Sequence, residues 1–498
     1  MTLKNNDRLY LIVCLAVSII YFLFMVWFYW TDFDVPDFGA YTWFYNAKFP
    51  AKDCFSSLFI AIFNGDNPFL RCVLYIVSLF SLSFCIFSFL YFFYKVFTPK
   101  LLEFILSVLF VISSGIWYYI YGKLVYDFPF SMLTFSFALI VLTKVFIDNN
   151  RRMFYLSLLS LLIGFYLSWK PYNIFLVVGT AVILLIHENT RYFIYKNLKT
   201  IKFIFIIILF FIVGMLLGNF HLIDNFSETL KGIKAYQSSY SFYNFLFFNE
   251  RLVWDHVNLM SYTATSFLLP TFVFVLFVFP LLLRKYLYVL LSSFLSMCMF
   301  IYITYFSPGY PWHGFSFSAF IILLFLVLLG YFKSLSLWHR RILLIVCYVV
   351  VSLQFIYTFT KYVPMQARWF YVTNEIGNNM LENKISVENT INEYVFKNNI
   401  NKSDYMLYVN FKRFILKERQ FRTLIDGRGR EFSFYSPPIG MSYLFSVYDI
   451  RQNMVASMMR IQKSLDENLI NNSYEKTTIY NEGNIVIDVY KKKKVNNK

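Results

Sequence analysis

Acidic residues gather in the stretch 31–41, where Asp32, Asp34 and Asp37 fall within six residues. Like charges this close repel one another, and they are easier to keep beside a cation, a metal ion or a hydroxyl group that one of them deprotonates. A carboxylate of this stretch could therefore act as a general base. The alternative is a solvated acidic turn that only caps the helix that follows it.

Three more residues could take part in chemistry, because each lies at the end of an apolar stretch. Asp127 precedes one such stretch, where the helix dipole stabilises a carboxylate and N-capping is the alternative role. Lys170 lies in a very short connection, where it either extends toward water or binds a phosphate. His313 lies in a Pro-Trp-His turn and is either a polar turn residue or a member of the same site.

Eleven apolar stretches, each about 16 to 26 residues long, must position these residues. About 20 apolar residues match the hydrocarbon thickness of a bilayer. The predicted spans are 9–30, 72–94, 101–121, 128–147, 153–169, 172–187, 203–221, 262–283, 286–306, 315–332 and 342–360. We therefore expect a polytopic α-helical membrane protein with about 11 transmembrane helices.

Basic residues flank every second connection between these spans, and the other connections hold fewer of them. Lys and Arg gather on the cytoplasmic side of membrane proteins. The inner set is Lys4, Arg8, Lys95, Lys100, Lys144, Arg151, Arg152, Arg191, Lys196, Lys199, Lys202, Arg284, Lys285, Lys333, Arg340 and Arg341. We expect a cytoplasmic N-terminus, short plain inner loops, an outer C-terminus, and long outer loops at 31–71 and 222–261.

The composition excludes a soluble globular protein, since 58% of the residues are hydrophobic and the mean hydropathy is +0.55. The first span is too long and too aromatic for a signal peptide and lacks a small-residue cleavage site, so it is expected to be an anchor. The net charge of +17 reflects the inner set, which suits anionic lipid headgroups. Membrane lipids are thus expected partners, and nucleic acid is not.

The composition becomes polar near residue 362, which divides a transmembrane module over 1–361 from an expected outer α/β domain over 362–498. Within this domain a helix is predicted at 386–399, with Ser386 as its N-cap.

Strand signals in the C-terminal domain follow that helix. Tyr405–Phe411 is typical of a buried strand, and Thr477–Tyr480 and Ile485–Tyr490 flank a turn and predict a hairpin. Asp426–Arg430 is read as a solvated turn, and no cluster of catalytic groups is found. The domain is therefore expected to have an accessory role.

The six cysteines show no metal-ligand spacing. Cys54 and Cys72 are both placed on the outer face, where they form either a disulfide or two free thiols. The other four lie inside spans and are expected to be packing residues.

The order of these features resembles the GT-C-type integral membrane glycosyltransferases, close to the protein O-mannosyltransferases and the lipid A aminoarabinose transferases. In that family the first outer loop opens with an Asp, often Asp-Glu, followed by a Tyr. Asp37 and Tyr41 are similarly spaced here, although Phe38 stands where a second acid is common. A basic residue then precedes an apolar stretch, similar to Lys52 before 54–63.

Four later residues extend the resemblance, which covers roughly residues 1–330. Arg71 enters the second span, Asp127 opens the fourth, Lys170 is followed by Pro, and the turn of His313 precedes a later span, all as in the family.

The resemblance implies that a sugar moves from a polyprenyl-phosphate donor to a glycan, lipid or protein acceptor at the outer face, in one inverting displacement. Asp37 is expected as the base, Asp34 is the alternative, and Asp127 would orient the acceptor. The donor phosphate is assigned to Lys52, Arg71 and Lys170, and the substrate to Tyr41 and His313. A divalent metal is left open, and a bacterial inner membrane is the expected location.

Two other classes of protein stay open. A polysaccharide polymerase or ligase also transfers sugars at the outer face, but its largest outer loop usually comes late in the chain. A lipid or polysaccharide transporter is not an enzyme, and it would be expected to show repeats or pairs of broken helices at the middle of the membrane. The sequence shows neither sign.

Overall fold

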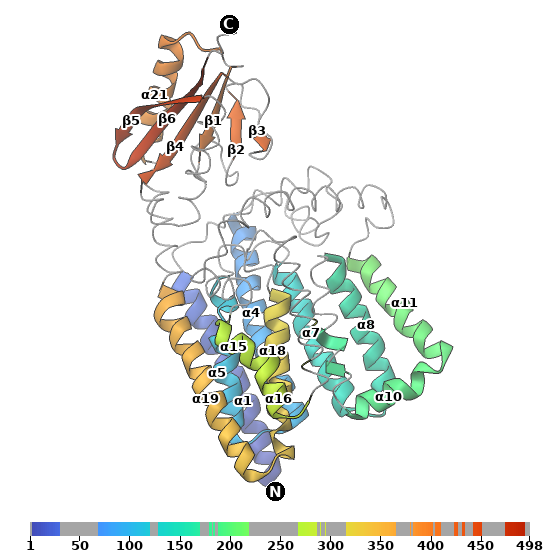
Figure 1. Ribbon diagram of the computed structural model, residues 1–498. Coiled ribbons are helices and arrows are strands. Elements are labelled where there is room, and N and C mark those ends of the chain that lie inside the picture. Colours follow the sequence, from blue (N-terminus) through green and yellow to red (C-terminus); the bar gives the residue numbers. More distant parts are fainter. Residues whose placement is uncertain are drawn as a thin grey trace. The chain divides into compact units, whose positions relative to one another are not determined.

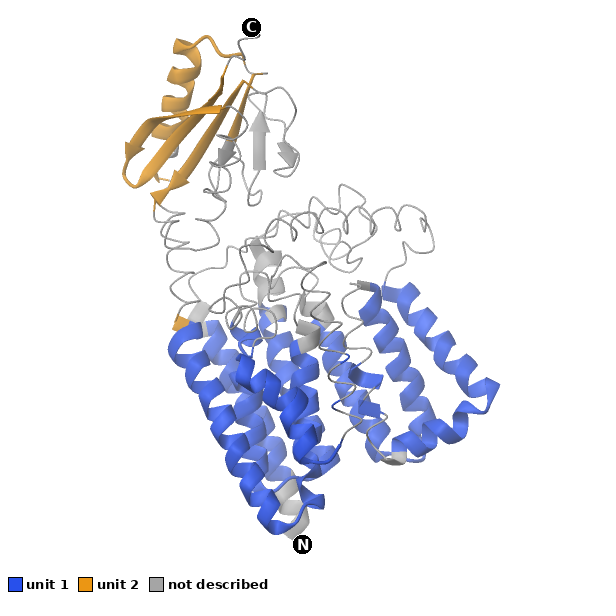
Figure 2. Ribbon diagram, in the orientation of Figure 1, with its two compact units in different colours: residues 1–35, 41–363 blue, residues 36–40, 364–498 orange. Residues whose placement is uncertain are grey.

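The computed structural model describes much of the chain, in separate stretches. These are residues 2–29, 68–119, 128–169, 179–181, 183–184, 188–218, 267–285, 289, 294, 315–364, 379, 382–401, 404–409, 423–426, 431–433, 442–450 and 474–493. The chain divides into two compact units, which Figure 2 colours separately: unit 1 is residues 1–35 and 41–363, and unit 2 is residues 36–40 and 364–498. Each unit is described by itself.

Unit 1 is a bundle of apolar helices (Figure 1). Its α-helices are α1 Thr2–Tyr29, α4 Pro68–Phe97, α5 Leu101–Ser113, α6 Ile116–Tyr119, α7 Phe128–Ile147, α8 Arg152–Trp169, α10 Glu188–Leu198, α11 Ile201–Gly218, α15 Leu269–Val273, α16 Phe279–Leu282, α18 Phe315–Gly330 and α19 Leu337–Tyr357. Two π-helices, η3 Phe274–Val278 and η6 Thr358–Tyr362, and one 3₁₀-helix, η5 Tyr331–Ser334, extend them.

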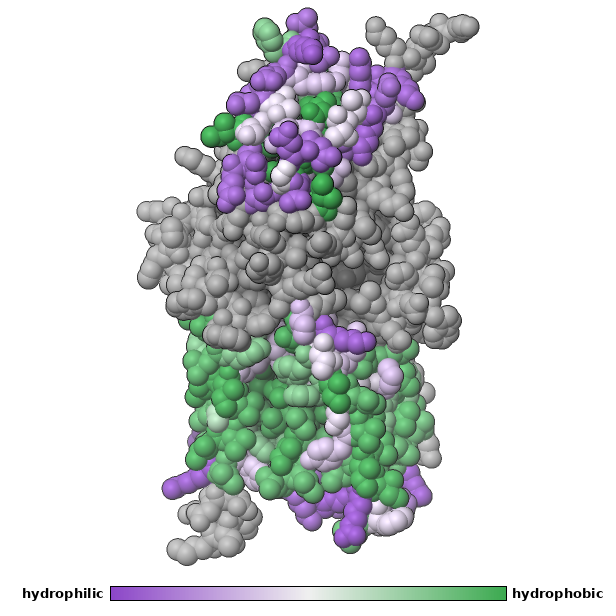
Figure 3. Space-filling view, turned by 90° about the vertical axis from the view of Figure 1, so that its left-hand side faces the viewer, coloured by the Kyte–Doolittle hydropathy of each residue, from purple (hydrophilic) through white to green (hydrophobic). Residues whose placement is uncertain are grey.

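Four of the described helical segments are long and apolar enough to cross a membrane. They are Arg8–Val26, Leu79–Phe97, Ile201–Gly218 and Leu337–Tyr362. Figure 3 shows the apolar band of this unit with hydrophilic residues below it. The chain is therefore a mainly helical membrane protein.

The number of spans stays a prediction. Five further described helices are apolar but shorter. The predicted spans 172–187 and 286–306 lie largely outside the described residues, so the structure does not test the count of eleven.

The directions of the helices define two ends of unit 1. Helices α4 and α7 are parallel, because the Phe84 ring contacts the Phe137 ring while the Phe92 ring contacts the Phe146 ring further along both helices. We call one end the basic end; it holds the stretches 97–101, 147–152, 283–285 and 331–341 (Figure 1). The opposite end, where α1 ends and α4 begins, is the loop end.

The described Lys and Arg residues of unit 1 lie at the basic end, apart from Arg71 and Lys361. This is the set that the sequence placed on the inner side. The basic residues that the sequence assigned to one side thus gather at one end of the folded bundle.

Helices α8 and α11 pack with their backbones in direct contact. A Cβ atom at Gly164 would overlap the carbonyl oxygen of Phe211, and one at Gly214 would overlap that of Leu161. The Ser160 hydroxyl also donates to the Ile207 carbonyl over 2.8 Å. Small residues commonly allow such close approach between membrane helices, where van der Waals contact takes the place of hydrophobic driving force.

Two parts of unit 1 differ from the sequence prediction. The span predicted over 101–121 is interrupted, since α5 ends at Ser113 and α6 begins at Ile116 after a turn at Gly115. Glycine weakens a helix interior, and side chains described below bind the freed carbonyls. The inner loop around residue 190, predicted to be plain, instead contains helix α10.

Unit 2 holds a six-stranded sheet of order β3-β2-β1-β4-β6-β5 (Figure 1). The strands are β1 Tyr405–Val409, β2 Thr423–Asp426, β3 Glu431–Ser433, β4 Tyr443–Asp449, β5 Tyr474–Glu482 and β6 Ile485–Lys492. Strands β1 and β4 are parallel, and the other neighbours are antiparallel.

Helix α21, Lys384–Lys397, covers one face of this sheet. Its buried Val387 and Ile391 pack against Phe445, Ile487 and neighbouring apolar residues of the central strands. Residues at this spacing lie on one face of a helix, which is why the sequence pattern predicted it.

The predicted helix and hairpin of this domain are confirmed, with one correction. The hairpin turns through Gly483 and Asn484, whose φ angles of 57° and 67° match a two-residue turn of type I′. The N-cap prediction for Ser386 is wrong, because the helix begins at Lys384 and Asn383 precedes it without a side-chain cap. Strands β2, β3 and β4 were not predicted, and the stretch read as a turn connects β2 to β3.

Candidate functional site

The predicted site residues fall almost entirely outside the described residues. Those outside are Asp34, Asp37, Tyr41, Lys52, Asp127, Lys170 and His313. Arg71 lies on the first turn of α4, where the structure describes the backbone. Cys54 is also outside the described residues, so the question of its pairing stays open too. The roles assigned to all these residues therefore stay predictions.

Five described helix ends adjoin these residues in the sequence, and all five lie at the loop end of unit 1 (Figure 1). They are the end of α1 at Tyr29, the start of α4 at Pro68, the start of α7 at Phe128, the end of α8 at Trp169 and the start of α18 at Phe315. The loop end is therefore the part of the bundle on which a site made from these residues would be built.

The end of α5 lies inside the bundle, and side chains bind its last carbonyl groups. The Trp117 indole N–H donates to the carbonyl of Val111 over 2.6 Å, and the Tyr118 hydroxyl donates to that of Ile112 over 3.0 Å. The last carbonyls of a helix have no partner within the helix, and at membrane depth water does not replace it. These aromatic side chains therefore make the interruption of α5 tolerable.

Gln354 of α19 connects three segments at this level. Its side-chain N–H donates to the carbonyl of Ser113 over 3.2 Å, and its side-chain oxygen accepts from the N–H of Leu268, just before α15, over 2.8 Å. The Thr358 hydroxyl donates to the same Ser113 carbonyl over 2.7 Å. Tyr21 of α1 adds a fourth segment, since its hydroxyl donates to the carbonyl of Trp117 over 2.9 Å. These hydrogen bonds join α1, α5, α6, α19 and the residue before α15 on the side of the bundle nearer the loop end.

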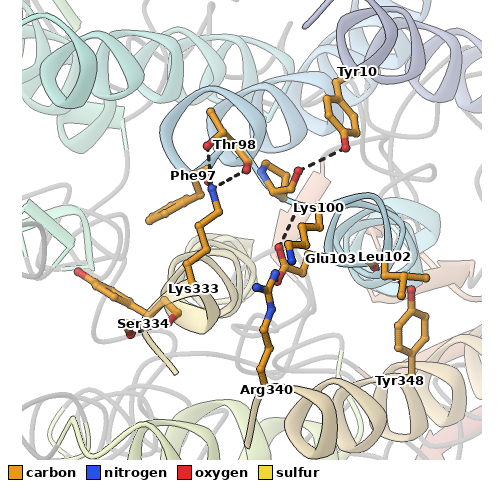
Figure 4. Close-up of polar contacts among 12 residues, drawn as sticks. Tyr10, Phe97, Thr98, Lys100, Leu102, Glu103, Lys333, Ser334, Arg340 and Tyr348 are labelled. Carbon is orange, nitrogen blue, oxygen red and sulfur yellow. Dashed lines mark hydrogen bonds and ion pairs between the residues drawn. The ribbon is translucent and has the colours of Figure 1, made fainter. Parts of the chain in front are cut away.

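A buried ion pair holds the basic end together (Figure 4). Glu103 on the first turn of α5 pairs with Arg340 of α19, and the carboxylate also accepts the backbone N–H of Lys100 over 2.9 Å. The Glu103 side chain is 4% exposed and that of Arg340 is 15% exposed. A buried carboxylate needs a partner of this kind, because desolvation costs several kcal/mol.

Lys333 binds the C-terminal end of α4 close to this ion pair (Figure 4). Its ammonium donates to the carbonyls of Phe97 and Thr98, each over 2.6 Å, and to the Thr98 hydroxyl over 2.8 Å. Thr98 has a φ of 43°, in the left-handed region that ends many helices. A cation at a helix C-terminus also interacts favourably with the helix dipole. Lys333 of η5 thus holds the end of α4, and Arg340 of α19 holds the start of α5.

The sequence prediction missed this cluster, although one signal for it was present. Glu103 is a carboxylate among the basic residues of the inner set, and an acid at the edge of an apolar span is expected to have a partner. Its partner lies 237 residues away, so no local pattern identifies it.

A second polar cluster, also missed, lies on the sheet of unit 2. The fully buried Asp488 carboxylate accepts hydrogen bonds from the hydroxyls of Thr478 over 2.7 Å and Tyr448 over 2.9 Å, and it pairs with Lys476 over 2.9 Å. Thr478 and Asp488 are direct partners in the hairpin, but a register shift between Thr478 and Tyr480 separates this pair from the turn, so the predicted turn alone does not reveal the contact. The cluster neutralises one buried charge within the sheet.

Among the described side chains, no group of three His, Cys, Asp or Glu residues could hold a metal ion. A comparison with protein-family models finds no match, and a comparison with curated proteins finds none either.

Proposed function

We propose that this chain is a membrane glycosyltransferase that moves a sugar from a polyprenyl-phosphate donor to an acceptor at the outer face of a bacterial inner membrane. The observation that carries the proposal is the common placement, at the loop end, of the five helix ends that adjoin the predicted site residues. These helix ends are distributed over almost 300 positions of the sequence, yet all of them lie at one end of the bundle.

The connectivity of the described helices supports eleven crossings. Helices α8 and α11 run parallel from the basic end, as the contacts of Ser160 with Ile207 and of Ser168 with Gly218 indicate. The chain must therefore return to the basic end between Trp169 and Glu188. It must also cross to the loop end between Lys285, whose ammonium lies over the Tyr331 ring, and the start of α18. These returns correspond to the predicted spans 172–187 and 286–306.

An odd number of crossings would place the two ends of unit 1 on opposite sides. The N-terminal end lies at the basic end, which the distribution of Lys and Arg assigns to the cytoplasm. The loop end then faces outward, and unit 2, which begins directly after α19 and η6, would be extracytoplasmic. Its accessory role would be to hold the acceptor or close over the membrane site.

The proposed chemistry uses two carboxylates and three cations. Asp37, or Asp34 in its place, removes the proton from the acceptor hydroxyl or amine while Asp127 orients it. Lys52, Arg71 and Lys170 hold the donor phosphate and stabilise the negative charge that develops on it as it departs. Tyr41 and His313 would contact the sugar or the acceptor.

The interrupted helix α5 does not favour a transporter. Discontinuous helices of transporters leave backbone carbonyls to coordinate ions. In α5 the carbonyls of Val111, Ile112 and Ser113 accept hydrogen bonds from side chains of the protein itself.

The test is a transfer assay with the purified full-length protein in lipid nanodiscs. A polyprenyl-phosphate sugar is the donor, membrane extract from the host supplies acceptors, and release of polyprenyl phosphate is followed. Asp37→Asn keeps the size of the side chain but removes the base, so the rate should fall by about 10²-fold or more. The matched control is Asp148→Asn at the basic end, where the carboxylate accepts the N–H groups of Asn150 and Arg151. That variant should keep the wild-type rate.

Two outcomes would contradict the proposal. One is full activity of both Asp37→Asn and Asp34→Asn, which would remove the base from this loop. The other is the absence of donor cleavage by the wild-type protein with all common polyprenyl-phosphate sugars, combined with donor movement across the membrane of sealed vesicles. That result would favour the transporter.

A further inference from the structure

Helix α10 presents a basic and aromatic surface at the basic end of unit 1. We call it the α10 surface, and it consists of Arg191, Tyr192, Tyr195, Lys196 and Lys199. All five side chains are exposed, with Tyr192 at 69% and Tyr195 at 67%. Exposed aromatic side chains that adjoin one another are typical of a surface that contacts a membrane or a partner.

The inner side of α10 is fixed to the bundle, so the outer side is presented rigidly. Thr190 is fully buried, and the ring of Phe193 lies 5.4 Å from the guanidinium carbon of Arg152 and 6.3 Å from the ring of Phe203. Arg152 in turn donates to the carbonyl of Val145 over 3.0 Å. Residues 190, 193 and 197 are on one side of the helix, and the α10 surface is on the other.

The position of α10 along the chain places this surface at the edge of the membrane. Helix α11 begins at Ile201, which is 85% exposed, and its 18 residues are apolar enough to cross a bilayer. The change from polar to apolar residues therefore occurs within the few residues between α10 and α11. Tyrosine is enriched at this depth, because its ring prefers the apolar side and its hydroxyl the polar side.

The charges of α10 identify the chemistry of what covers it. Residues 188–202 hold four cations, Arg191, Lys196, Lys199 and Lys202, against the single carboxylate of Glu188. The Lys199 ammonium lies 5.8 Å from the centre of the Tyr195 ring, so the cations and the aromatic rings form one surface. An amphipathic helix with basic and aromatic residues is the common means of binding anionic lipid headgroups in the plane of a membrane.

We infer that the α10 surface binds the headgroups of anionic phospholipids. This role is separate from the proposed sugar transfer, which uses the loop end. It gives this end of the protein a preference for one class of lipid.

The test is native mass spectrometry of the full-length protein in detergent, titrated with dioleoylphosphatidylglycerol and, separately, with dioleoylphosphatidylcholine. The variant R191Q/K196Q/K199Q removes three charges from the α10 surface. The control K144Q/R284Q/R341Q removes three exposed charges from other parts of the basic end. Gel filtration establishes that both variants keep the wild-type size, and the single variant K199Q replaces the triple variant if the triple variant fails to fold.

A basic residue near an anionic membrane surface strengthens attachment about fivefold, so losing three should weaken binding of the anionic lipid by at least about tenfold. The control should lose less anionic-lipid affinity than the α10 variant, and binding of phosphatidylcholine should be the same in all three proteins. The affinity difference between wild type and the α10 variant should shrink at high salt.

If the α10 variant and the control lost equal affinity for the anionic lipid, the inference would be overturned. The lipid would then respond to the total charge of the basic end and not to the α10 surface. Equal affinity of the wild type for the two lipids would also overturn it and would point to an acidic partner outside the membrane.

Discussion

Replacing Arg340 by Met should destabilise unit 1, because it leaves the Glu103 carboxylate buried without its cation. Removing one partner of a fully buried ion pair costs about 3–5 kcal/mol. Arg340 is 15% exposed, and Glu103 keeps the hydrogen bond from the N–H of Lys100. Partial exposure and the remaining hydrogen bond both lower the cost, so we expect a loss of about 2–3 kcal/mol.

The assay is unfolding in mixed micelles by increasing the fraction of sodium dodecyl sulfate, followed by tryptophan fluorescence. Trp117 is fully buried in unit 1 and should report the transition. The matched control is Arg341→Met, which changes the neighbouring residue on the same helix, whose side chain is exposed. It should change the free energy of unfolding by less than about 0.5 kcal/mol.

A double variant separates loss of the pair from loss of packing. In Glu103→Gln/Arg340→Met the buried charge is gone, so the loss should be smaller than the sum of the two single losses by about 1–2 kcal/mol. Additive single losses, or equal effects of Arg340→Met and Arg341→Met, would refute this account of the basic end.

Two further predictions concern other parts of the chain. Gly214→Leu should push α8 and α11 apart and lower the free energy of unfolding by about 1–3 kcal/mol or more. The neighbouring Val213→Leu should have little effect. A Gly214→Leu variant as stable as wild type would contradict the close packing seen at Leu161. An alkaline-phosphatase fusion at Asn497 should be active and a fluorescent-protein fusion there dark, whereas an inactive phosphatase with a bright fluorescent fusion would reverse the proposed topology.

The periodic and compositional features of the fold could be predicted from the sequence. The apolar spans and the inner basic residues come from runs and charges that are local in the sequence, and the described cations lie where those runs placed them. Helix α21 and the β5–β6 hairpin likewise follow from the spacing of Val387 and Ile391 and from the turn at Gly483.

Features that depend on distant residues could not be predicted. The pair of Glu103 with Arg340 and the three-segment contact of Gln354 join residues far apart in the chain. Strand β4 was missed because Leu444 to Val447 are buried on both faces of the sheet, which removes the alternation that marks a half-buried strand. Arg71 is the one predicted site residue whose backbone the structure describes, so the arrangement of the candidate site stays a prediction.

The Glu103–Arg340 pair has a consequence for the order in which the protein can be completed during synthesis. Helices α4 and α5 are joined by only Thr98–Lys100, so they would enter the membrane together as a hairpin that carries the Glu103 carboxylate. Its partner is made 237 residues later, about 10 to 50 seconds at ordinary rates of translation. During this interval the carboxylate must stay near water or a temporary partner. The arrival of α19 would therefore be the step that lets the hairpin settle to its final depth.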